Sequence, residues 1–110
     1  MAREEFVGSG AVRWLLRQSA HVLVLVLDGH PDLPVLTWLV TPDGLRGHAE
    51  VCDLDRGRDR RVFTAWADAL PVVDGFDPAP ALDESGVTRL RADRRVDGVP
   101  VTLTATVHPF

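Results

Sequence analysis

The sequence predicts a single α+β domain in which two helices pack on one face of a four-stranded antiparallel sheet. The first observation is that apolar residues recur at helical spacing over about residues 10–28 and 59–70. The second is that alternating patterns broken by turn residues indicate a β-hairpin after each helix, giving the order α-ββ-α-ββ. The third is the length of 110 residues, which suffices for one hydrophobic core and is too short for two.

The first helix is predicted from residues that repeat at three- and four-residue steps: Val12, Leu15, Leu16, Ser19, Leu23, Val26 and Leu27. Gly29 and Pro31 then end it, and we expect residues 1–9 to be a flexible end. Within this segment, residues 22–27 alternate valine and leucine, which also fits a buried strand. The pattern alone leaves both interpretations of residues 22–27 open.

A first hairpin is predicted with strands at about 35–41 and 45–52, joined by Thr-Pro-Asp-Gly. Pro42 favours a type I turn followed by a bulge at Gly44, which would place Thr41 opposite Leu45. In that register, apolar side chains of the first strand share a face of the hairpin with the polar side chains of the second strand. Together with Val24 and Leu25 of the first helix they form a candidate interaction surface: Val24, Leu25, Leu36, Trp38 and Val40. Burial of the same side chains under the second helix is the competing interpretation.

The second helix and its following connection are predicted from a clear change of pattern. Val62, Phe63, Trp66 and Leu70 share one face of a helix over about residues 59–70. Residues 71–85 hold three of the eight prolines and indicate a long irregular connection.

The second hairpin has the strongest local signal in the chain. Asp-Gly at 97–98 is typical of a type I′ turn, so Val96 should face Val99 and the strands should pair outward from there. Arg94 falls on the apolar side, close enough to the turn for its side chain to reach water. The opposite side carries a candidate anion-binding face with threonines of the partner strand around it: Arg89, Arg91 and Arg95.

His48, Glu50 and Cys52 alternate along one strand and match the start of a zinc deaminase signature, His-x-Glu. That signature needs two further cysteine ligands, and no cysteine follows Cys52. The segment is therefore interpreted as the polar face of a strand, with metal binding through His48, Glu50 and Cys52 as a remote alternative. We expect no catalytic residue, no cofactor and no metal site.

Composition limits the functional classes further. Hydrophobic residues make up 45% and charged residues 25%, which is ordinary for a soluble domain. A lone cysteine indicates a reducing, cytoplasmic compartment, and the six-residue apolar run at 22–27 is too short to span a bilayer, so no membrane partner is expected. The net charge of −4 makes nucleic acid an unfavourable partner.

These observations predict a non-enzymatic protein-interaction domain that binds a protein partner or a second copy of itself as a homodimer. The alternative is a nucleic-acid-associated accessory protein that uses the arginine and threonine face. The string "HPDLPVLTWLVTPDGLRGH", the helix with "FTAWADAL" and the final "DGVPVTLTATV" resemble small uncharacterised proteins of Streptomyces and related actinobacteria. The resemblance implies a GC-rich actinobacterial source and a compact cytoplasmic α+β domain, and it implies no activity or cofactor.

Overall fold

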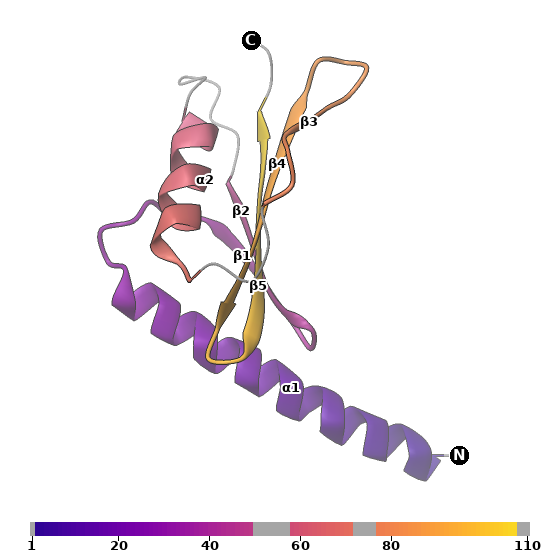
Figure 1. Ribbon diagram of the computed structural model, residues 1–110. Helices are drawn as coiled ribbons and strands as arrows, with labels where there is room; N and C mark the ends of the chain where they lie inside the picture. The colour runs from indigo at the N-terminus through magenta and orange to yellow at the C-terminus, as the bar shows by residue number, and fades with distance from the viewer. Residues whose placement is uncertain (1, 50–57, 72–76, 108–110) are drawn as a thin grey trace.

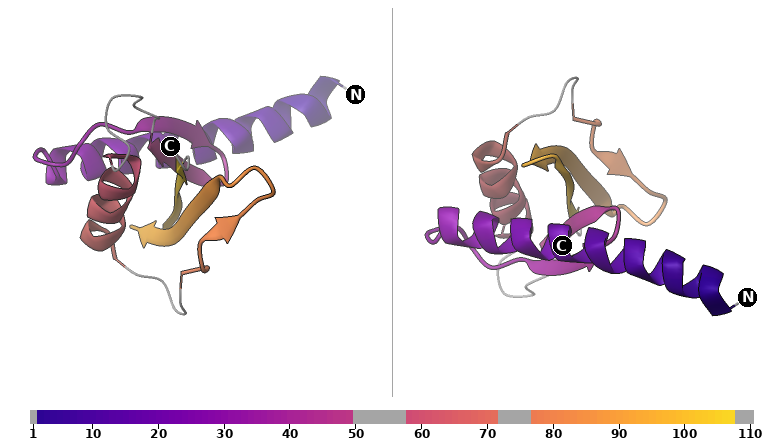
Figure 2. Two further views of the ribbon diagram at one scale, coloured as in Figure 1. Left: turned by 90° about the horizontal axis from the view of Figure 1, so that it is seen from above. Right: turned by 90° about the horizontal axis from the view of Figure 1, so that it is seen from below.

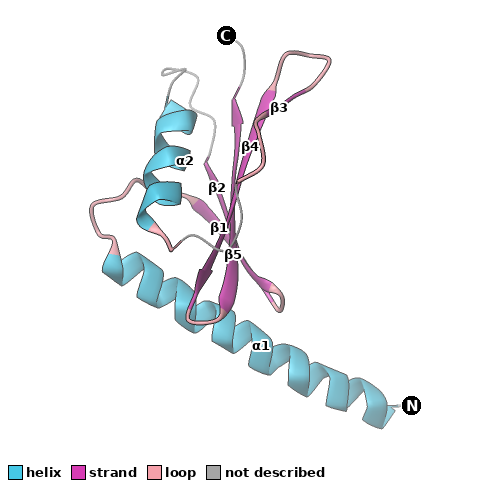
Figure 3. Cartoon of the chain, viewed as in Figure 1, coloured by secondary structure: helices cyan, strands magenta, loops and turns pink. Residues whose placement is uncertain are grey.

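A computed structural model describes residues 2–49, 58–71 and 77–107 of the chain. It confirms an α+β domain, with two helices and a five-stranded sheet (Figure 3). The elements in chain order are α1 (Ala2–Gly29), β1 (Thr37–Thr41), β2 (Gly44–Ala49), α2 (Arg58–Ala69), β3 (Ala81–Leu82), β4 (Thr88–Val96) and β5 (Val99–Val107).

The sheet differs from the predicted four antiparallel strands. Its order is β1-β2-β5-β4-β3, and β2 runs parallel to the central strand β5 (Figure 1). The fifth strand, β3, comes from the connection that we predicted to be irregular. Each hairpin turn fixes only the pairing inside its own hairpin, whereas the β2–β5 pairing is made between hairpins across the whole fold. Local patterns therefore carry no information on its direction.

The β4–β5 hairpin has the predicted register. Val96 pairs with Val99, and Asp97 and Gly98 both have positive φ, at 49° and 79°, as a type I′ turn requires. The strands then pair through to Thr88 opposite Val107. A two-residue turn that matches the strand twist was sufficient to set all nine pairs.

The β1–β2 hairpin has a different register from the predicted one. Thr41 pairs with Gly44, so Trp38 lies opposite Gly47 and not beside His48. A side chain at Gly44 would overlap the carbonyl oxygen of Pro100, which β5 brings against this turn. Gly44 therefore lies inside β2, in close contact with β5, instead of in a bulge.

The core lies between one face of the sheet and the two helices. Side chains that alternate along the central strands are buried on this face, and both helices contribute to the same cluster: Val22, Val26, Leu45, Ala49, Val62, Trp66, Leu90, Ala92, Val101, Leu103 and Ala105. Helix α2 lies along this face, and α1 crosses the sheet at the β1 side (Figure 2). Both helices thus contribute to one core, and no described helix covers the other face.

Trp66 is the centre of an aromatic group between α2 and the first hairpin. Its indole is 1% exposed, and Nε1 donates a hydrogen bond to the carbonyl oxygen of Pro34 at 2.7 Å. Trp38 and His30 meet it edge to face, with ring centroids 5.4 and 5.9 Å away. Gly47 leaves room for Trp38, because a Cβ there would lie 2.9 Å from the Trp38 ring.

The prediction that the Arg94 side chain reaches water is wrong. This side chain is 4% exposed and makes a bidentate ion pair with Asp77, with N···O distances of 2.7 and 2.9 Å. It also donates to the carbonyl oxygens of Ala67 and Asp93. The hydrogen bonds from Arg94 hold the pKa of Asp77 below its ordinary value, and the same pair raises that of Arg94. One buried guanidinium thereby joins β4, α2 and the chain at Asp77.

Replacing Asp77 by asparagine should destabilise the fold in a pH-dependent way. The Asp77 side chain is 41% exposed, so solvent screens part of the interaction. We expect a loss of about 1–2 kcal/mol in the free energy of unfolding at neutral pH. A lowered folded-state pKa stabilises the native state above the ordinary value of 3.8, and this stability is lost as the pH falls through the folded value.

Urea denaturation at neutral pH and at steps below pH 4 therefore checks whether the gap between wild type and Asp77→Asn closes in acid. Asp93→Asn is the matched control, because that carboxylate meets the exposed Arg91 and should change stability by less than about 0.5 kcal/mol. An equal loss in both variants would contradict the role given to Arg94.

Helix α1 settles the question left open for residues 22–27, which are helical. It begins at Ala2, earlier than predicted, and has 28 residues. Ser19, Val22 and Val26 form its buried stripe against the sheet. The N-terminal part projects past the sheet and gives the molecule its long dimension, 52 Å against 33 and 30 Å (Figure 1).

Candidate functional site

The first candidate site is the uncovered surface of α1. Six large apolar side chains on this helix are between 40% and 59% exposed: Val12, Trp14, Leu15, Val24, Leu25 and Leu27. Val12 and Leu15 continue the stripe of Ser19, Val22 and Val26 beyond the end of the sheet, because they precede it at three- and four-residue steps. Trp14, Val24 and Leu25 lie on other sides of the helix. We call these six side chains the α1 surface.

The structure divides the interaction surface predicted from the sequence. Val24 and Leu25 are exposed and belong to the α1 surface. Leu36 is buried in the core, and Trp38 and Val40 pack against it. The prediction was wrong for these three because it depended on the β1–β2 register, and a shift of one residue moves every side chain of a strand to the other face.

Part of α1 meets the length and composition of a membrane-spanning helix. The segment Gly10–Gly29 has a mean hydropathy of 1.2, and 17% of the apolar window within it is buried in the domain. Helices in the cores of soluble proteins and signal sequences have the same properties. That the protein has no membrane partner stays a prediction. Binding of the protein to lipid vesicles tests it.

The second candidate site is the face of the sheet that no described helix covers. Its side chains form rows across the strands, because cross-strand partners point the same way. One row is Arg91, Thr104 and His48, and the next is Arg89 beside Thr106. The His48 Nδ1 and the Thr104 hydroxyl are 2.8 Å apart and share a hydrogen bond.

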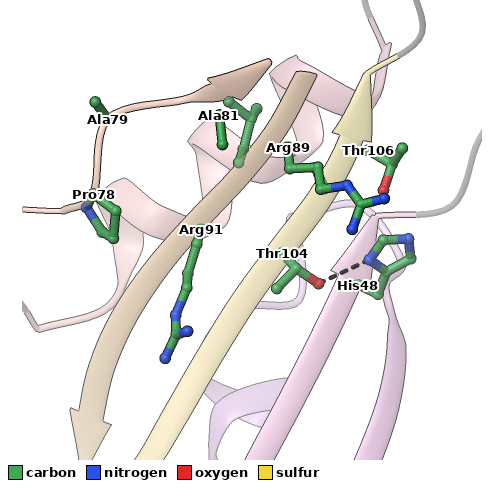
Figure 4. A pocket seen from close by; sticks show the side chains of 10 residues that line it. His48, Pro78, Ala79, Ala81, Arg89, Arg91, Thr104 and Thr106 are labelled. Carbon is green, nitrogen blue, oxygen red and sulfur yellow. Dashed lines mark hydrogen bonds between the residues drawn. The ribbon is translucent and has the colours of Figure 1, made fainter. Parts of the chain in front are cut away.

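These rows line a groove of about 500 Å³ (Figure 4). Its polar lining consists of His48, Arg89, Arg91, Thr104 and Thr106. The chain around Pro78, Ala79 and Ala81 forms an apolar wall, and the small Ala105 adds to the lining. Arg89 extends from β4 across β5 toward the side of His48. We call this cavity the outer groove.

Carboxylates stand beside the arginines of the outer groove without lining it. Asp83 Oδ2 is 3.9 Å from Arg89, and Asp93 Oδ1 is 3.3 Å from Arg91. Asp83 also accepts hydrogen bonds from the Ser85 hydroxyl and the backbone nitrogens of Ser85 and Val87, and these lower its pKa. The arginine side chains are 71% and 59% exposed, so these pairs are weak and leave donors free.

Two of the three arginines predicted as an anion-binding face, Arg89 and Arg91, therefore line one cavity. Arg95 lies farther along β4 and is exposed outside the groove. Of the remote metal alternative, only His48 is described, and Glu50 and Cys52 lie outside the described residues. Within the part of the chain that the structure describes, no three metal-ligand side chains come together.

Comparison with known proteins adds no relative: no family model, no curated protein and no solved structure matches the chain. Both candidate sites are therefore inferred from the geometry of this molecule alone.

Sequence reasoning placed the threonines of β5 around the arginine face but missed that His48 belongs to the same site. Alternation along β5 indicated that the threonines share a face, which was a usable signal. Nothing local indicated that His48 would lie beside them, because that contact needs β2 to pair with β5. The exposed state of Val12 and Leu15 was also missed, since their spacing is that of an ordinary core stripe.

Proposed function

We propose that this protein is a non-enzymatic interaction domain and that α1 binds the α1 of a second copy to form a homodimer. The observation that carries the proposal is the α1 surface, with six large apolar side chains exposed on one helix. Small soluble domains seldom leave so many large apolar side chains exposed on one helix without a partner. Removing them from water is favourable in proportion to the area buried.

A second copy is favoured as the partner for two reasons. Two-fold dimers are the commonest oligomers, and in such a dimer the same patch on each chain covers the other. In addition, Val12 and Leu15 extend a stripe that is already buried at Val22 and Val26. A neighbouring helix would continue the kind of apolar contact that this stripe makes with the sheet.

The size of α1 predicts a weak dimer. Twenty residues of helix are about 30 Å long and 10 Å wide, so one face presents on the order of 300 Å². Stable interfaces bury about 800 Å² on each partner. We therefore expect dissociation at roughly 10–100 µM.

Leu15→Glu should weaken this dimer. Leu15 is 40% exposed on the part of the α1 stripe that projects past the sheet, so the substitution leaves the core intact and places a charge in the interface. Sedimentation equilibrium of the wild type should show a dimer that dissociates on dilution. The variant should dissociate at a concentration about tenfold or more higher.

Leu82→Glu is the matched control, because it makes the same exchange at a 70% exposed leucine on β3, at the far edge of the sheet. It should leave the dimer unchanged. A wild-type protein that stays monomeric at several hundred micromolar, or equal weakening by both variants, would refute self-association through α1. Co-sedimentation of the monomer with lipid vesicles, lost in Leu15→Glu, would assign α1 to a membrane surface instead.

The nucleic-acid alternative depends on the arginines of the uncovered sheet face. Arg46, Arg89, Arg91 and Arg95 all lie on it, while Asp93 interrupts the row. No described aromatic side chain stands among them for base stacking. This alternative stays the second candidate, and an oligonucleotide is included in the test of the outer groove below.

A further inference from the structure

We infer that the outer groove is a binding site for a small organic oxyanion, a carboxylate or phosphate monoester joined to a flat apolar body. This goes beyond the proposed dimer, because the groove lies on the uncovered face of the sheet whereas α1 packs on the core side. Three features carry the inference: the size of the cavity, the donors that line it, and the apolar wall beside them.

The donors come from three neighbouring strands. Arg89 and Arg91 project from β4, Thr104 and Thr106 from β5, and His48 from β2. A guanidinium and hydroxyl groups are the donors that bind carboxylate and phosphate oxygens, and arginine can bind them with two parallel hydrogen bonds. Thr104 is engaged by Nδ1 of His48, which leaves the ring's Nε2 without a partner among the described residues. No described carboxylate lines the cavity.

The apolar part of the ligand is inferred from the rest of the lining. Pro78, Ala79 and Ala81 stand on the β3 side and offer no charged group. The apolar part of the ligand is therefore inferred to lie against this wall, with its anionic group on the polar lining.

A small molecule is favoured over a nucleic acid by the dimensions and by the charges around the groove. A volume of about 500 Å³ matches small-ligand sites, which span roughly 300–1,000 Å³. Asp83 and Asp93 stand beside the two arginines, so a longer polyanion passing through would meet carboxylates. The net charge of −4 opposes long polyanions in the same way.

The test uses phenyl phosphate and benzoate as probes and benzyl alcohol as the uncharged control, followed by amide shifts in two-dimensional NMR of the full chain. At least one anion should saturate at millimolar concentration with the largest shifts at Thr104 and Thr106. Arg89→Gln should weaken this binding about tenfold, the effect expected for one charge-assisted hydrogen bond. Arg95→Gln is the matched control, on the same strand and face but outside the groove, and should bind like the wild type.

Saturation by only one of the two anions would identify its class and support the inference. Equal weakening in Arg89→Gln and Arg95→Gln, shifts away from β5, or no saturation by either anion at roughly 10 mM would overturn it. Binding of a single-stranded oligonucleotide that falls steeply with salt and weakens equally in both variants would also overturn it, in favour of the nucleic-acid alternative. Both arginines are exposed, so both variants are expected to fold, and circular dichroism checks this.

Discussion

Trp66→Ala is expected to lower the free energy of unfolding by about 3–5 kcal/mol, the range for large aromatic truncations in a core. The indole is 1% exposed and stands between Trp38 and His30, so its removal leaves a cavity that two rings and a helix would have to collapse into. The hydrogen bond to the carbonyl of Pro34 is lost as well. Urea denaturation followed by circular dichroism measures the change.

The matched control is Trp14→Ala, because this tryptophan is 59% exposed on α1. It should change stability by less than about 0.5 kcal/mol at concentrations where the protein is monomeric. A finer comparison replaces Trp66 and Trp38, one at a time, by phenylalanine. Trp66→Phe breaks a hydrogen bond, whereas Trp38→Phe removes a buried Nε1 that has no partner among the described residues, so the first should cost more. The reverse order would contradict the structure of this cluster.

Gly44→Ala is expected to cost about 2–4 kcal/mol, which combines an unfavourable backbone conformation with overpacking. Gly44 has φ 145°, a conformation that residues with a Cβ rarely adopt. The added methyl group would also overlap the carbonyl oxygen of Pro100 on β5. The Pro100 carbonyl is backbone and cannot change rotamer as a side chain can. Either β2 or β5 would therefore have to shift where the two hairpins meet.

Two other glycines separate these causes. Gly98→Ala meets open space but has φ 79°, so only the backbone cost applies, about 1 kcal/mol. Gly29→Ala meets open space at the end of α1 without a positive φ and should be nearly neutral. Denaturation of the three variants should rank the losses as Gly44, then Gly98, then Gly29. If Gly44→Ala loses no more stability than Gly98→Ala, the Pro100 carbonyl does not restrict a side chain at position 44.

The two candidate sites differ in how far the sequence could reveal them. The arginines of the outer groove were visible in the sequence, because alternation along β4 puts Arg89 and Arg91 on the side away from Leu90 and Ala92. The groove itself was not visible. It requires β5 to carry its threonines between β4 and β2, and it requires the chain at Pro78 to return beside β4.

For the α1 surface, the sequence shows which residues are apolar but does not show that they are exposed. The apolar spacing of Val12, Leu15, Val22 and Val26 is continuous in the sequence, and it predicts a helix that packs on a core along its whole length. The sheet ends before the helix does, so only the C-terminal part of the stripe is buried. Periodicity reports which side of a helix is apolar and does not report how much of that side finds a partner.

The sequence by itself determined the features that arise from neighbours along the chain. Helix α2 follows from the spacing of Val62 and Trp66, and the β4–β5 register follows from the type I′ turn at Asp97 and Gly98. These elements satisfy their hydrogen bonds within a few residues or across one tight turn, so local chemistry is enough to specify them.

Only the tertiary structure decided the remaining features. The parallel pairing of β2 with β5, the register of β1 and the burial of Arg94 against Asp77 all depend on contacts between segments far apart in the chain. At Gly44, the carbonyl of Pro100 lies where a Cβ would stand, and Thr41 pairs with Gly44 instead of with Leu45 as predicted from the turn. Such contacts form only when the whole core closes, and the same closure brings His48 beside Thr104.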